Sequence, residues 1–112
     1  MAFHVVYSRH YWDYEDGNGT FANSWTIYKN VPYSELFKMK DAIPSLKENA
    51  DQVYADYESK KDYKVDPKQF HMSEVFIVDD EEYFWTYDDE FGNDGTPYSD
   101  KSYYHDYGQN IP

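Results

Sequence analysis

Aromatic side chains are the main apolar material from which this chain can build a core. Tyr, Phe and Trp make up 21% of its 112 residues, while all apolar types together reach only 40%. Disordered acidic chains are poor in aromatics, so this composition favours a folded protein. A chain of this length has room for one modest core. We therefore expect a single domain over residues 1–112, built largely around rings.

Two strands joined by a tight turn are predicted at the start of the chain. Residues 3–12 and 20–29 are rich in the β-branched and aromatic types that favour strands. The sequence DGNG at 16–19 lies between them, and its Gly and Asn residues accept the positive φ angles of a hairpin turn. Because side chains alternate along a strand, one face of the second strand should carry Phe21, Asn23, Trp25 and Ile27.

The middle of the chain predicts one or two helices. Residues 34–43 place their apolar side chains along one stripe. Pro44 should end or kink this helix, because it has no N–H and clashes with the preceding turn. Ser45 and Glu48 then have the spacing of a capping box, in which each side chain satisfies a free backbone N–H. A second helix is predicted from about residue 46 to 61.

The second half of the chain returns to strand-like sequence. Residues 73–78 and 82–88 predict two further strands, with a turn at 79–81. The resulting order predicts an α+β domain, with an antiparallel sheet of about four strands and the helices on one face. Residues 96–112 lack a clear periodicity, and should form either an edge strand or an ordered tail.

Negative charge is concentrated in the C-terminal third. The chain carries −12 overall; residues 1–72 contribute −2 and residues 73–112 contribute −10, with Lys101 as the only base there. Eight carboxylates and no basic residue lie between positions 77 and 95. Such a field repels nucleic acids and anionic membranes and attracts basic partners. We therefore expect a basic protein surface as partner, with no direct binding to nucleic acid or membrane.

Catalysis and metal binding have little support in the sequence. There is no Gly-rich phosphate loop and no nucleophile-elbow serine. The loops starting at Asp16 and Glu90 look like calcium loops, but they place Ile27 and Lys101 where an EF-hand needs its last carboxylate. The histidines do not have a zinc-binding spacing. We therefore expect a protein that is not an enzyme and has no catalytic residue, metal or cofactor.

Cysteine content and the N-terminal sequence bear on the compartment. The chain contains no cysteine, which excludes disulfides and thiolate metal sites. Small secreted domains usually need disulfides, and the first residues, MAFHVVYSRHYW, lack the basic and long apolar regions of a signal peptide. No apolar run approaches the ~18 residues of a membrane span. These features predict a cytoplasmic protein.

Acidic and tyrosine side chains are the candidates for partner binding. Carboxylates two positions apart on a strand lie about 6.6 Å apart on one face, so two acidic strand ends would present charge on the length scale of a phosphate backbone. Exposed Tyr adds a large, rigid contact area with a polar tip. The expected partner-binding residues are the acids Asp79, Asp80, Glu81, Glu82, Asp88, Asp89, Glu90 and Asp94, and the tyrosines Tyr83, Tyr87, Tyr103 and Tyr104.

In size, acidity, lack of Cys, richness in Tyr and Asp, and absence of enzyme motifs, the chain resembles phage- or plasmid-encoded inhibitors of host defence. These include anti-CRISPR and anti-restriction proteins, many of which mimic DNA. The resemblance implies a small acidic inhibitor that occupies the basic nucleic-acid-binding groove of a host defence nuclease. It covers general character only, so it transfers no site residues.

Two other functions stay open on the sequence. One is an adaptor or structural module whose partner does not bind nucleic acid. The other is a small binder of a sugar, nucleotide or cation that uses Tyr, Trp and Asp side chains.

Overall fold

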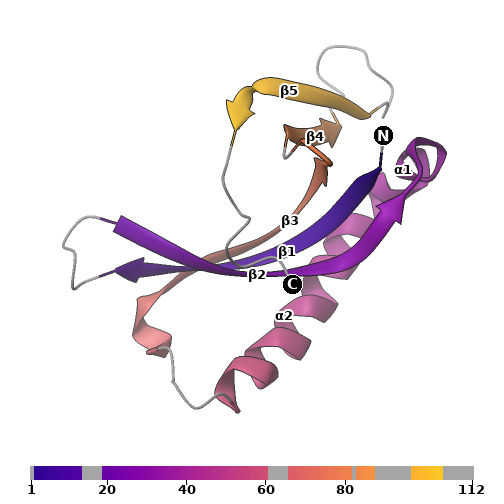
Figure 1. Cartoon of the computed structure of the whole chain (residues 1–112). Helices are drawn as coiled ribbons and strands as arrows, with labels where there is room; N and C mark the ends of the chain where they lie inside the picture. Colours follow the sequence, from indigo (N-terminus) through magenta and orange to yellow (C-terminus); the bar gives the residue numbers. More distant parts are fainter. Residues whose placement is uncertain (1, 14–18, 61–65, 82, 88–96, 105–112) are drawn as a thin grey trace.

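One antiparallel sheet, with strand order β2-β1-β3-β4-β5, forms the frame of the molecule. The computed structural model describes residues 2–13, 19–60, 66–81, 83–87 and 97–104. Helix α2 lies across one face of the sheet. At one end of the sheet, β4 and β5 curl away from the plane of the other strands (Figure 1). The predicted α+β class, with a helix on one face of an antiparallel sheet, is confirmed. None of the described helices is long and apolar enough to cross a membrane.

The predicted hairpin is formed by β1 (Phe3–Asp13) and β2 (Gly19–Val31), which pair along their whole length. Its register is irregular near Val5, and Asn30 in β2 has a φ of 57°. Asn is one of the few non-glycine residues that adopt this conformation readily. The predicted common face of β2 is confirmed, because its alternate residues contact the helix side of the structure.

The helical segment consists of α1 (Tyr33–Met39), η1 (Lys40–Ala42) and α2 (Ile43–Ser59). Pro44 lies in the first turn of α2 and no side chain caps this helix, so the predicted capping box of Ser45 and Glu48 is wrong. The first turn of a helix has N–H groups without intrahelical partners, so a residue that lacks an N–H costs little there. Pro44 therefore begins a helix here and does not end one.

The remaining strands are β3 (Phe70–Asp79), β4 (Tyr83–Tyr87) and β5 (Pro97–Tyr104), and the short helix η2 (Pro67–Gln69) precedes β3. β3 pairs with β1 on one side and with β4 on the other, which places β1 inside the sheet. β5 pairs with β4 at the outer edge. Of the two alternatives for the C-terminal segment, the edge strand is what residues 97–104 form, and it brings the sheet to five strands.

Two clusters of buried side chains hold α1 and α2 to the sheet. The first is mainly aliphatic and consists of Phe3, Val5, Val31, Leu36 and Ile77. In the second, Tyr54 of α2 stacks on Tyr7 and Trp25, with ring centroids 5.4 and 4.4 Å away. Rings thus supply the contact with the middle of α2, while aliphatic side chains together with Phe3 fill the end near α1.

Leu36 is fully buried in the first cluster, whereas Ser45 is exposed on α2. We expect Leu36→Ala to lower the free energy of unfolding by about 2–5 kcal/mol, because it leaves a cavity. Ser45→Ala should change it by less than about 0.5 kcal/mol, since no cap is lost. Urea unfolding of both variants measures this, and a cost near 1 kcal/mol for Ser45→Ala would restore the capping box.

Candidate functional site

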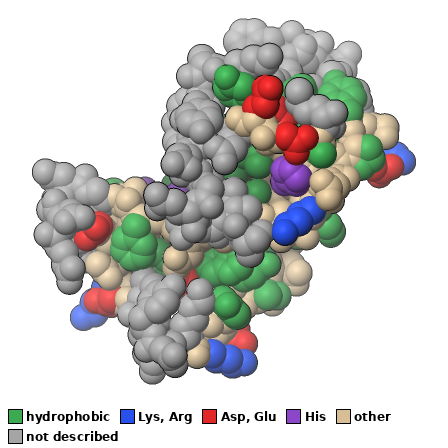
Figure 2. Space-filling model, in the orientation of Figure 1, with side chains coloured by type: hydrophobic (Ala, Val, Ile, Leu, Met, Phe, Trp, Pro, Cys, Tyr) green, Lys and Arg blue, Asp and Glu red, His purple; other side chains and the backbone are tan. Residues whose placement is uncertain are grey.

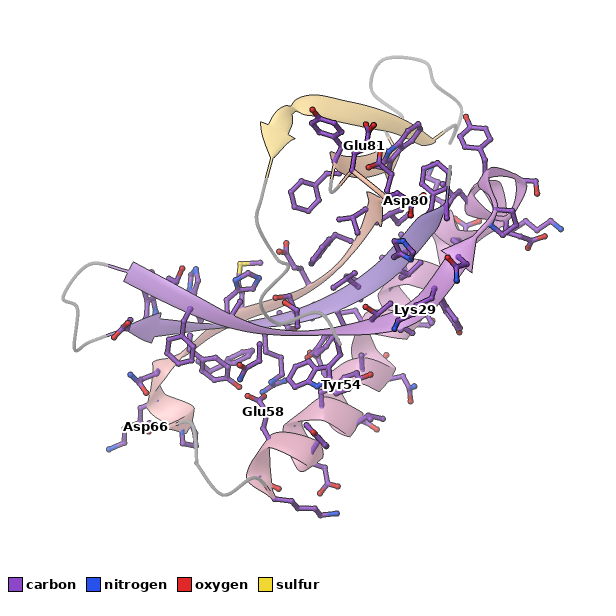
Figure 3. The ribbon with its side chains drawn as sticks, in the orientation of Figure 1. Lys29, Tyr54, Glu58, Asp66, Asp80 and Glu81 are labelled. Atoms are coloured by element: carbon purple, nitrogen blue, oxygen red, sulfur yellow. The ribbon has the colours of Figure 1, made fainter. Side chains whose placement is uncertain are left out.

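The turn between β3 and β4 brings the described part of the acidic run to one end of the sheet. Asp80 and Glu81 are both exposed there (Figure 3). Asp80 accepts a hydrogen bond from the backbone N–H of Ala2 at 2.9 Å, and its other oxygen lies 3.1 Å from Nε2 of His4. Acidic and histidine side chains are seen side by side at the upper part of the face in Figure 2. The Ala2 and then the His4 hydrogen bonds lower the pKa of Asp80.

Asp79 has a different role from its neighbours. Its side chain is turned inward, and the residue is only 2% exposed. One carboxylate oxygen accepts from the backbone N–H groups of Glu81 and Tyr83, at 2.8 and 3.2 Å, and the other from Trp85 Nε1 at 3.0 Å. Strand alternation places Asp79 on the same side as the core, so it fixes the turn and is not available to a partner. Its expected place among the partner-binding acids is corrected on this ground.

The other predicted partner-binding residues are distributed around β4 and β5. Tyr83 is half-buried and pairs with Tyr104 across the two strands, so the acidic turn and the end of β5 share one corner of the sheet. Tyr103 precedes Tyr104 in β5, while Tyr87 lies at the opposite end of β4. The predicted acids that lie outside the described residues are Glu82, Asp88, Asp89, Glu90 and Asp94.

A second polar cluster lies between α2 and the sheet, and the sequence interpretation missed it. Arg9 of β1 forms an ion pair through Nε with Glu58 of α2, and its Nη1 lies 3.9 Å from Asp51. The Arg9 and Glu58 side chains are only 13% and 8% exposed. Glu58 projects from α2 toward the sheet in Figure 3. A buried ion pair is costly unless further hydrogen bonds satisfy both groups, and its surroundings provide them.

Glu58 accepts hydrogen bonds from Tyr11 at 2.6 Å and from Asn23 Nδ2 at 3.0 Å. Asp51 accepts from the hydroxyl groups of Tyr7 and Ser73, the latter at 2.6 Å, and from Lys47 at 3.0 Å. Burial alone would raise the pKa of Asp51, but these hydrogen bonds outweigh it and lower the pKa.

These partners come from four separate elements, so sequence spacing could not assemble them. One signal was present in the sequence. Arg9 shares one face of a predicted strand with Tyr7 and Tyr11. If that face is buried, Arg9 needs an acidic partner.

The two tyrosines of this cluster are held in their neutral form. Burial, and then the hydrogen bonds that they donate to Asp51 and Glu58, raise the pKa of Tyr7 and of Tyr11 to about 12. Protonated phenols therefore donate hydrogen bonds to both carboxylates, those of Asp51 and Glu58.

A pocket of about 510 Å³ opens beside this cluster, between the last turns of α2, η2 and the strands β1 and β3. Its apolar lining is supplied by Tyr11, Ala55, Pro67 and Phe70. Arg9, Glu58 and Ser59 provide the polar groups. Small-molecule sites have this size and this mixture of apolar walls and few polar groups.

Among the described residues, no three His, Asp or Glu side chains converge in a group that could hold a metal ion. Comparison of the chain with protein-family models, curated proteins and solved structures finds no match. Conclusions about function therefore rest on the acidic turn, on the buried polar cluster and on the pocket beside it.

Asp79→Asn tests the role of the buried turn carboxylate. One acceptor oxygen would be replaced by an NH2 group facing either Trp85 Nε1 or the two backbone donors, so a buried donor would lose its acceptor. We expect a loss of about 1–3 kcal/mol in the free energy of unfolding, measured by urea denaturation. Asp80→Asn is the matched control, because Asp80 is exposed, and it should cost clearly less. Equal effects of the two substitutions would contradict the assignment of Asp79 to the turn.

The raised pKa of Tyr11 predicts a stability change at alkaline pH. Above pH 10 the unfolded chain releases the phenolic proton, while the folded protein keeps it up to about pH 12. Stability is therefore complete below pH 10 and falls as the pH rises through this interval. In Tyr11→Phe the slope of unfolding free energy against pH should be smaller than in the parent. An equal slope for Tyr11→Phe and the parent would contradict the prediction.

Proposed function

We propose that this protein is an acidic, non-enzymatic inhibitor that binds the basic nucleic-acid-binding groove of another protein. In this proposal, Asp80 and Glu81, together with the acids that follow them in the sequence, stand in for phosphates. A host defence nuclease is the class of target that fits this chemistry. The observation that carries the proposal is the uneven neutralisation of charge along the chain.

Four bases of residues 1–72 form ion pairs with acids of the same segment. Arg9 pairs with Glu58, and on the helices three lysines pair within one turn: Lys38 with Glu35, Lys47 with Asp51 and Lys60 with Asp56. The carboxylates of residues 73–112 have a single base in their own segment and a net charge of −10. The net negative charge of residues 73–112 would attract a basic groove.

The acidic turn also has the rigidity that imitation of a nucleic-acid backbone requires. Three hydrogen bonds to Asp79 hold the backbone N–H of Glu81, the backbone N–H of Tyr83 and the ring of Trp85. Trp85 in turn packs edge-on against Phe3, with ring centroids 4.9 Å apart. Asp80 and Glu81 therefore project from a turn that is bonded to the core, so little ordering entropy would oppose binding.

A competition experiment tests the proposal. Labelled duplex DNA is bound to each member of a panel of defence nucleases, and its displacement by this protein is followed by fluorescence polarisation at two salt concentrations. We expect displacement from at least one nuclease, weaker at the higher salt because exposed charges are screened. The protein alone should not bind the duplex, because its own field opposes it.

Two variants with the same net charge separate a local acidic surface from a general charge effect. The first carries Asp80→Asn, Glu81→Gln, Asp88→Asn and Asp89→Asn. The control carries Glu35→Gln, Asp41→Asn, Glu48→Gln and Asp56→Asn, and the four control positions are exposed. Exposed pairs contribute up to about 1 kcal/mol each, so the first variant should compete at least about tenfold less well. The control should compete like the parent. Equal losses in both variants, or no displacement from any nuclease, would contradict the proposal.

A further inference from the structure

The pocket beside Arg9 contains one polar group whose hydrogen-bonding capacity is incompletely used. A guanidinium carries five N–H donors. Nε of Arg9 is engaged by Glu58 and by the Tyr11 hydroxyl at 3.1 Å, and Nη1 donates to the Tyr7 hydroxyl at 3.0 Å. The residues that the structure describes give Nη2 no hydrogen-bond partner. The Arg9 side chain is 13% exposed, and it lines the pocket.

Glu58, the other charged group of the pocket, is already satisfied. Its two oxygens face Arg9, Tyr11 and Asn23, which leaves little capacity for a further donor. A ligand that enters the pocket therefore meets an N–H donor that has no acceptor among the described residues, and a carboxylate that already has three donors. This favours a ligand with an acceptor over one with a donor.

The local charge balance favours a ligand without net charge. The positive charges of Arg9 and Lys47 are matched by the negative charges of Glu58 and Asp51. An anionic ligand would gain from Arg9 but would be repelled by Glu58 at the same depth and by the chain's overall charge of −12. A neutral acceptor avoids this repulsion and still uses Nη2, which has no partner among the described residues.

The walls favour a flat apolar body. Phe70 is 40% exposed although it lines the pocket, and the guanidinium carbon of Arg9 lies 4.8 Å from the centre of its ring. Tyr11 meets Phe70 edge-on, with ring centroids 5.8 Å apart. Aromatic side chains in this arrangement pack well against another planar ring.

From these observations we propose that the pocket between α2, η2 and β1 binds a small, planar, uncharged aromatic molecule whose carbonyl oxygen accepts a hydrogen bond from Arg9. This site lies on the helix side of the sheet and does not depend on the inhibitor function proposed above. A small-ligand binder is one of the alternatives that the sequence leaves open. The pocket gives that alternative a specific location and a ligand class.

Cinnamamide and cinnamate form a suitable pair of probes, because they share a planar aromatic shape and differ in charge. Each is titrated into the isotopically labelled protein, and chemical shifts are followed by heteronuclear NMR. Cinnamamide should shift the backbone amides of Ala55, Ser59 and Phe70 and the guanidinium signals of Arg9 in a saturable way. For a ligand of this size we expect a Kd in the millimolar range. Cinnamate should bind at least about tenfold more weakly.

A blocking variant tests the location without disturbing the buried ion pair. Ala55 is exposed on α2 and lines the pocket, so Ala55→Phe fills the space while the protein keeps its core. Gln52→Phe adds the same ring at an exposed position of α2 outside the lining. We expect Ala55→Phe to weaken cinnamamide binding at least about tenfold and Gln52→Phe to leave it unchanged.

Three results would overturn this inference. If cinnamamide shifts none of these signals up to its solubility limit, the pocket is not a site for this class of ligand. If cinnamate binds as tightly as cinnamamide, Arg9 recognises an anion. If Ala55→Phe binds like the parent, the ligand occupies another place.

Discussion

The ion pair between Arg9 and Glu58 is the contact on which the far half of the helix–sheet interface depends. The aliphatic cluster around Leu36 ends before the last turns of α2, and Tyr54 continues the contact through stacked rings. Beyond Tyr54, a buried charge of β1 meets a buried charge of α2. Removing either partner would leave the other buried and uncompensated, which costs several kcal/mol. The position of α2 over β1 is therefore fixed by charge at one end and by apolar packing at the other.

This arrangement also determines the environment of the pocket. Glu58 already accepts hydrogen bonds from Tyr11 and Asn23 and pairs with Arg9, whereas the described residues give Nη2 of Arg9 no partner. The same ion pair thus orients α2 and leaves a donor at the pocket wall. A structural contact and a binding group are combined in one side chain.

Two adjacent carboxylates at the β3–β4 turn show how position decides the role of a charge. Asp79 and Asp80 follow each other in the chain, but Asp79, the last residue of β3, is buried, whereas Asp80 in the following turn is exposed. Asp79 uses its charge on backbone N–H groups and Trp85. Asp80 contacts the start of β1 through Ala2 and His4 and remains accessible. An acidic run is therefore not a uniform surface, and only its outward-facing members are candidates for contact with a partner.

The sequence by itself determined the element types, the first hairpin and the α+β class, because alternation, turn residues and helical periodicity act over a few neighbouring residues. It also determined the charge asymmetry, which is a property of composition. Tertiary structure decided that Pro44 begins a helix, because a missing N–H is harmless only where no partner exists. It decided that Asp79 is buried, and that Arg9 meets Glu58 although 49 positions separate them. Such pairings depend on which strand face α2 covers, and that is set by the packing of the whole chain and by no local pattern.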